Sequence, residues 1–143
     1  MTFGEFHSKL KTLKLDQLMR ETIKDNDKVL ITVNRSQLRG GFDAEGKQLK
    51  QYRSIRYAKA KQKLSSYKAP FRIPDLYLTG SFQNNMNLRV SGSEWDISSS
   101  DNKAEGLYRK YGEIFGIAEQ NLPTVQRIMT PRLGAKIKMQ LGL

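Results

Sequence analysis

The chain has 143 residues, a formal net charge of +11, no cysteine and one histidine, His7. This composition excludes disulfides, thiolate metal ligands and a histidine-rich metal cluster. No apolar run of about 18 residues is present, so we expect no membrane span, and Met1–Leu10 lacks the apolar core of a secretory signal.

The N-terminal part, residues 1–38, is predicted to be helical. Large apolar residues recur at spacings of three to five and predict an amphipathic helix over residues 2–20. Thr2 is its expected N-cap, with Glu5 completing a capping box. A second helix is predicted over 26–38, although its run of β-branched residues also suits a strand.

Residues 39–74 are predicted to form a long basic loop excursion. A turn signal, Asp43-Ala44-Glu45-Gly46, lies near its start. Residues 50–74 then contain eight Lys and Arg and no acid, with few large apolar residues. We therefore expect this segment to be exposed, although residues 54–64 have the composition of a short helix.

A β-hairpin is predicted within residues 75–112. Apolar and polar residues alternate from Phe82 to Val90 and again around Trp95 and Ile97, and Ser91-Gly92-Ser93 supplies a turn between them. Residues 106–111 suit either a third strand or a short helix. The sheet is therefore expected to have three or four antiparallel strands.

The C-terminal segment, residues 113–143, is predicted to end in a helix that begins near Asn121 and Pro123. An apolar stripe from Val125 to Leu141 gives this helix a packing face, and Pro131 is expected to bend or break it. The elements together predict a single α+β domain over residues 1–143, with terminal helices packed on the small antiparallel sheet.

The sequence contains no clear catalytic, cofactor-binding or metal-binding motif. Glu94 and Asp96 share one face of the predicted second strand, and with Asp43 and Glu45 they are candidates for a metal-dependent nuclease. For Glu94 and Asp96, solvated carboxylates on the outer face of a hairpin are the simpler explanation, because Trp95 and Ile97 take the other face. We therefore predict a protein that is not an enzyme and needs no cofactor or metal.

The basic segment is predicted to be a contact surface. Basic groups pair with phosphates, and tyrosines either stack on unpaired bases or pack against a neighbouring subunit. No helix-turn-helix, zinc-finger or RNA-recognition signature is present, so any contact with nucleic acid is expected to be directed to the backbone and sensitive to salt. The predicted contact residues are Lys50, Tyr52, Arg53, Arg56, Tyr57, Lys59, Lys61, Lys63, Lys68 and Arg72.

Several short motifs follow one another in residues 43–112: the turn at Asp43, the basic excursion, Leu76-Tyr77-Leu78-Thr79-Gly80-Ser81-Phe82, the hairpin, and Tyr108-Arg109-Lys110-Tyr111-Gly112. This order resembles the phage virion-morphogenesis and tail-completion family, which includes head–tail connector and neck proteins. Residues 113–118 depart from the Arg-Pro-Phe-like element that the family often has there. The family-like positions are Asp43, Gly46, Leu76, Thr79, Gly80, Tyr108 and Gly112.

The resemblance implies a structural phage virion protein of the head–tail neck or tail-completion ring. The implied partners are other neck, tail and connector proteins and further copies in a homo-oligomeric ring, with non-specific contact to packaged DNA and no membrane. The protein is expected to be made in the host cytoplasm and to reside in the virion. The alternative from the residues alone is a small basic protein that binds nucleic acid non-specifically.

Overall fold

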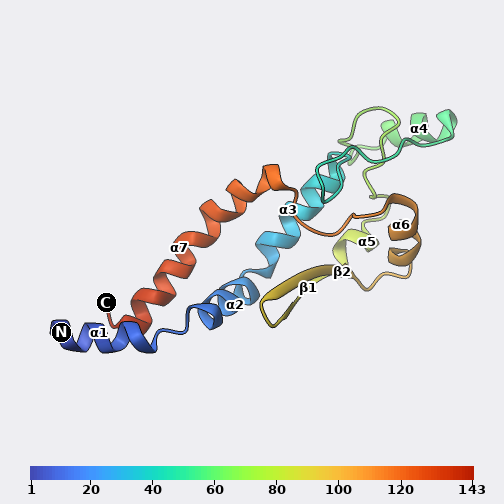
Figure 1. Ribbon diagram of the computed structural model, residues 1–143. Coiled ribbons are helices and arrows are strands. Elements are labelled where there is room, and N and C mark those ends of the chain that lie inside the picture. Colours follow the sequence, from blue (N-terminus) through green and yellow to red (C-terminus); the bar gives the residue numbers. More distant parts are fainter.

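The computed structural model describes residues 1–143 and contains seven α-helices and one two-stranded sheet (Figure 1). The α+β class, with helices at both termini, is thereby confirmed. The elements in chain order are α1 (Phe3–Thr12), α2 (Leu15–Asp25), α3 (Asp27–Arg39), α4 (Ile55–Gln62), α5 (Ser81–Asn84), β1 (Met86–Ser91), β2 (Glu94–Ser99), α6 (Ala104–Tyr111), the 3-10 turn η1 (Glu119–Asn121) and α7 (Leu122–Leu141).

The predicted first helix is two helices in the structure, because Leu13 is extended and separates α1 from α2. The predicted capping box is confirmed: Glu5 N donates to Thr2 Oγ1 over 3.1 Å, and Thr2 N donates to Glu5 Oε2 over 2.6 Å. The third helical segment, α3, is a helix and not the alternative strand. Helix α1 buries none of its residues.

The hairpin is confirmed but is shorter than predicted. Strand β1 pairs antiparallel with β2, from Met86 opposite Ser99 to Ser91 opposite Glu94. Phe82 and Gln83 form the helical turn α5 instead of a strand, and both are buried. Successive strand residues point to opposite faces, so a strand with one solvated face would not bury both. Residues 104–111 are helical as well, which leaves a sheet of two strands and not three or four.

The predicted basic loop is not a loop throughout. Ser54 caps helix α4 by accepting a hydrogen bond from Tyr57 N over 3.1 Å. Most of the basic side chains are exposed, as expected, but apolar residues spread along the segment anchor it to the rest of the protein. The buried anchors are Leu49, Ala58, Ala69 and Ile73.

Helix α7 runs back along α1 and α2, so the two termini lie at the same end of the molecule and α4 lies at the other (Figure 1). Lys9 Nζ donates to Leu141 O over 3.2 Å and joins the first helix to the last. Pro131 lies inside α7 without breaking it. Pro131 and Arg127 are both exposed, so water can bond the Arg127 carbonyl that the missing N–H leaves free.

The core forms where α3 meets the hairpin and the long connections. Three α3 residues, Leu30, Ile31 and Leu38, contribute to it. The other seven come from the loops, α5 and the hairpin: Leu49, Ala69, Ile73, Phe82, Met86, Ile97 and Ile114.

Two buried amides of α3 hold the connection between α6 and α7. Asn34 Nδ2 donates to Ile114 O, and Gly116 N donates to Asn34 Oδ1, both over 3.0 Å. Gln37 Oε1 accepts from Ala118 N over 2.8 Å, and Gln37 Nε2 donates to Gly116 O over 3.0 Å. These bonds satisfy backbone groups that no sheet or helix would pair.

Replacing Asn34 with alanine should therefore lower the free energy of unfolding by about 2–4 kcal/mol, because the Ile114 and Gly116 backbone groups lose their partners in a buried site. Urea unfolding followed by circular dichroism measures this change. The exposed Gln126→Ala on α7 is the control and should cost less than about 0.5 kcal/mol. Equal effects of the two substitutions would contradict this role for Asn34.

Candidate functional site

A cleft of about 490 Å³ opens between the segment Lys50–Ser54, the segment Leu76–Phe82 and helix α6. No acidic side chain lines it. Its volume lies within the range of pockets that hold small ligands. The basic lining residues are Lys50, Arg53, Lys61, Lys103 and Lys110, and the tyrosines are Tyr52, Tyr57, Tyr77 and Tyr111.

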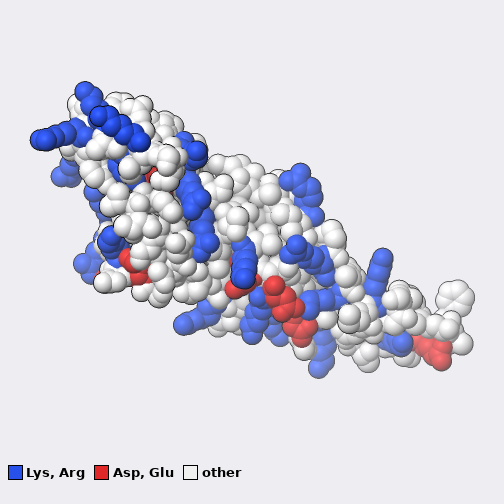
Figure 2. Space-filling view, turned by 180° about the vertical axis from the view of Figure 1, so that it is seen from behind, with Lys and Arg blue, Asp and Glu red and all other residues white.

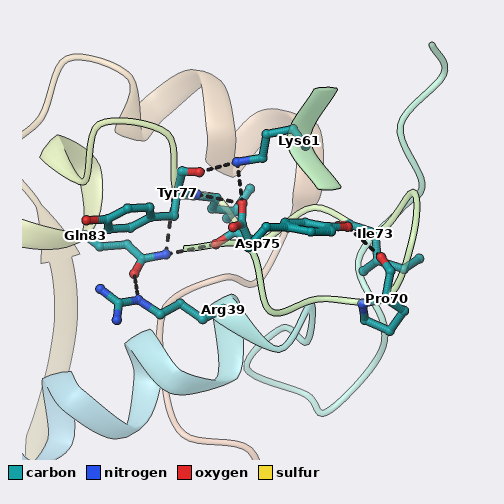
Figure 3. A network of polar contacts seen from close by, with 9 residues as sticks. Arg39, Lys61, Pro70, Ile73, Asp75, Tyr77 and Gln83 are labelled. Carbon is teal, nitrogen blue, oxygen red and sulfur yellow. Dashed lines mark hydrogen bonds and ion pairs between the residues drawn. The ribbon is translucent and has the colours of Figure 1, made fainter. Parts of the chain in front are cut away.

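Lys61, one of the lining residues, belongs to a buried ion pair. Lys61 Nζ lies 2.8 Å from Asp75 Oδ1, with the two side chains 3% and 0% exposed (Figure 3). Lys61 Nζ also donates to the Tyr77 carbonyl, and Tyr77 N donates to Asp75 Oδ1 over 3.0 Å. The pair therefore fixes helix α4 to the Asp75–Tyr77 segment.

Gln83 extends this network to helix α3. Its Nε2 donates to Asp75 O over 2.9 Å, and Arg39 Nε donates to Gln83 Oε1 over 3.0 Å (Figure 3). The Arg39 guanidinium carbon also lies 4.8 Å from the centre of the Tyr77 ring. The wall of the cleft at Tyr77 is thus held from α3, α4 and α5 at once.

Four cations at the cleft, Lys50, Arg53, Lys103 and Lys110, are exposed and make no ion pair with a carboxylate of the chain. They differ in this from Lys61, whose charge Asp75 balances. Hydrogen bonds from Ser81 Oγ and Lys103 N hold the pKa of nearby Asp101 below its usual range, so this one carboxylate stays charged and offsets only part of the four positive charges. The outer part of the cleft therefore carries a net positive charge.

The tyrosines of the cleft form a cluster beside the buried pair. The rings of Tyr52 and Tyr57 meet edge to face, with their centres 5.0 Å apart and their planes at 82°. Burial, together with the charge of Asp75, raises the pKa of Tyr52 far above its ordinary value. Burial also raises the pKa of Tyr111. These two phenols stay neutral and fixed, whereas Tyr57 is 45% exposed.

The structure divides the ten predicted contact residues into three groups. Lys50, Tyr52, Arg53 and Tyr57 line the cleft beside its open space. Lys61 and Arg72 are committed to the fold instead: Lys61 is in the buried pair, and Arg72 Nη2 donates to Tyr52 O over 3.0 Å. The remaining four lie outside the cleft: Arg56, Lys59, Lys63 and Lys68.

Sequence reasoning missed the contribution of helix α6. The cleft is completed by Lys103, Lys110 and Tyr111, which lie about fifty to sixty residues beyond Lys50 in the chain. The short Tyr108–Gly112 motif was the only signal in this region, and it did not indicate which side chains would face the basic segment.

The structure brings together two parts of the family-like pattern. Asp43 Oδ1 accepts from Glu45 N and from Lys47 N, each over 2.9 Å, and orders the turn. Ala44 N, within this turn, donates to Glu113 O over 2.8 Å. The Tyr108 hydroxyl donates to Glu113 Oε1 over 3.0 Å, so Glu113 joins the turn to the end of α6.

The other family-like positions lie at chain reversals or beside the cleft. Gly46, Gly80 and Gly112 have positive φ angles of 81°, 86° and 78°, which glycine adopts without strain. Leu76 and Thr79 lie in the wall of the cleft with Gly80. A side chain at Gly80 would meet the Tyr77 hydroxyl at 2.8 Å, so the wall needs glycine there.

The four acidic candidates do not form a site. Asp43 and Glu45 lie in the turn, where Glu45 pairs with Lys47 over 2.9 Å, while Glu94 and Asp96 are exposed on the hairpin. No group of three or more histidine or acidic side chains is arranged to hold a metal ion. None of the helices is both long and apolar enough to span a membrane.

Comparison with known proteins found no matching family, no matching characterised protein and no matching solved structure. The resemblance to phage virion-morphogenesis proteins therefore stays a prediction that rests on the motifs.

Replacing Lys61 with methionine should lower the free energy of unfolding by about 3–5 kcal/mol, because Asp75 is left as an unpaired buried charge. Adding Asp75→Asn should recover most of this loss, since the asparagine oxygen can still accept from Tyr77 N. Urea unfolding of both variants measures the coupling. Lys59→Met, on the exposed side of the same helix, is the control; an equal loss there would refute the assignment to the ion pair.

Stability should fall as the pH rises above 10.0, the ordinary pKa of tyrosine. Above this pH the unfolded chain loses the Tyr52 proton while the folded chain keeps it, so proton loss favours unfolding until the raised folded pKa is passed. Tyr52→Phe should make the decline shallower. Urea unfolding from about pH 9 to 11 tests this, and an unchanged slope in the variant would contradict it.

Proposed function

We propose that the chain is a structural protein of a phage virion, which joins neighbouring subunits at the head–tail neck or in a tail-completion ring. The order of the motifs in residues 43–112 supports the phage assignment. The large exposed surface of the single chain is the observation that carries the structural role.

The chain exposes more surface than a compact monomer of its mass. It exposes 9548 Å² at 16.4 kDa, whereas a compact monomer of this size exposes about 7500 Å². The difference, about 2000 Å², is comparable with the area that a stable interface buries. Only 23 of the 143 residues are buried, so the core is small as well. Contacts with neighbouring subunits would supply the missing burial.

Two different surfaces are available for such contacts. At the end formed by α1 and the last turn of α7, Phe3, Met139 and Leu143 are 95%, 80% and 70% exposed. Large apolar side chains with this much exposure are candidates for burial against another subunit. At the α4 end, Lys and Arg gather and acidic residues are sparse (Figure 2). Unlike surfaces at opposite ends suit a head-to-tail arrangement, which closes into a ring when the rotation between subunits allows it.

Removal of this chain from the phage that encodes it should leave heads and tails that are not joined. Wild-type protein supplied in trans should restore infectious particles, whereas Phe3→Glu with Met139→Glu should not, because charges at the apolar end oppose its burial in an interface. Plaque counts and electron microscopy of the particles measure the outcome.

The matched control is Ser8→Glu with Gln140→Glu, which adds the same charge to exposed polar positions of the same two helices. This control should restore infection. Circular dichroism of both purified double variants should show the wild-type helix content, since neither alters a buried residue. Joined, infectious particles formed without the chain would refute the proposed function.

A further inference from the structure

We propose that the cleft between Lys50–Ser54, Leu76–Phe82 and helix α6 binds single-stranded nucleic acid. The rim cations hold backbone phosphate, and the exposed Tyr57 ring stacks on an unpaired base. The cleft includes α4 residues, so it lies at the basic end that the proposed virion role also uses, but its test measures binding by the isolated chain and can fail separately from that role.

The charges at the cleft favour an anionic ligand. Lys50 and Arg53 approach from one side, and Lys103 and Lys110 approach from the start and the end of α6. None of the four has a carboxylate partner, and no acidic side chain lines the space between them. Such a group of like charges raises the local concentration of anions and contacts phosphates directly.

Hydrogen-bond donors lie beside these charges. The backbone N–H groups of Leu78, Thr79 and Gly80 make no hydrogen bond within the chain, and all three residues line the cleft. Successive free N–H groups in a turn suit the oxygens of an anion. The two non-bridging oxygens of a backbone phosphate can accept hydrogen bonds from these N–H groups while the neighbouring cations balance its charge.

The aromatic side chains favour an unpaired strand over a duplex. Tyr57 is 45% exposed, and the edge-to-face contact with half-buried Tyr52 fixes its position. Base stacking on an aromatic ring needs a base that is free of its own stack, as in a single strand. The basic groups and the exposed Tyr57 ring around this cleft therefore suit a strand that offers both phosphates and unpaired bases.

The cleft does not need to fold around its ligand. The Lys61–Asp75 pair fixes α4 against one wall, and Gln83 holds the same wall to α3 through Arg39. Ligand binding then costs little ordering of the protein, which favours measurable affinity from a few contacts.

The test is fluorescence anisotropy of the full chain with a labelled single-stranded oligothymidine and with a duplex containing the same strand. The wild-type chain should bind the single strand about tenfold more tightly than the duplex, the effect of one or two stacked bases. Tyr57→Leu should remove this preference. Tyr108→Leu is the control, because Tyr108 is also 45% exposed and lies outside the cleft.

The charge requirement is tested with Lys103→Gln and Lys110→Gln together. This variant should weaken single-strand binding about tenfold and reduce the salt slope by about 1.4, the value for two lost phosphate contacts. Lys59→Gln with Lys63→Gln removes the same charge from exposed positions outside the cleft and should have a much smaller effect.

Three results would overturn the proposal. Equal losses in the two charge variants would show diffuse attraction to the whole basic surface. Equal affinity for single strand and duplex would remove the role of stacking. Displacement of the oligonucleotide by an equal concentration of an oligoglutamate peptide would identify the cleft as a site for an acidic protein segment.

Discussion

The fold depends on buried polar side chains that satisfy the backbone of long connections. The sheet has two strands, so it cannot pair the carbonyl and amide groups of residues 40–80 and 112–121. Asn34, Gln37 and Gln83 instead make specific hydrogen bonds to those segments, and Lys61 binds the Tyr77 carbonyl. Because an unpaired buried backbone group is costly, each of these side chains determines the path of a loop.

Several local structures could be predicted from the sequence because they depend on residues that are close together in the chain. The Thr2 capping box, the third helix, the turn at Asp43 and the hairpin around Gly92 each depend on residues within a few positions of one another. Helix α5 was missed because alternating polarity around Phe82 matched a strand. A helical turn is favoured because it buries both residues: Phe82 packs in the core against Phe115, and Gln83 bonds to the distant Asp75 and Arg39.

The cleft could be predicted only in part. The basic segment and its tyrosines were visible in the sequence, but charge says nothing about which lysine is buried. Lys61 and Lys59 are two residues apart on one short helix, and only Lys61 faces Asp75. Likewise, tertiary structure places Lys110 of helix α6 around the same cleft as Lys50 and Arg53, and neither segment alone has a signature of this arrangement.

The Lys61–Asp75 pair also constrains how this sequence can change over time. Either residue alone is hard to replace, since the other then stays charged in a site with almost no exposure to water. An apolar pair at the same positions would be acceptable, yet reaching it one codon at a time passes through a destabilised intermediate. The two positions should therefore be inherited as a unit and should covary among descendants of this chain, while the freely exposed lysines beside them drift independently.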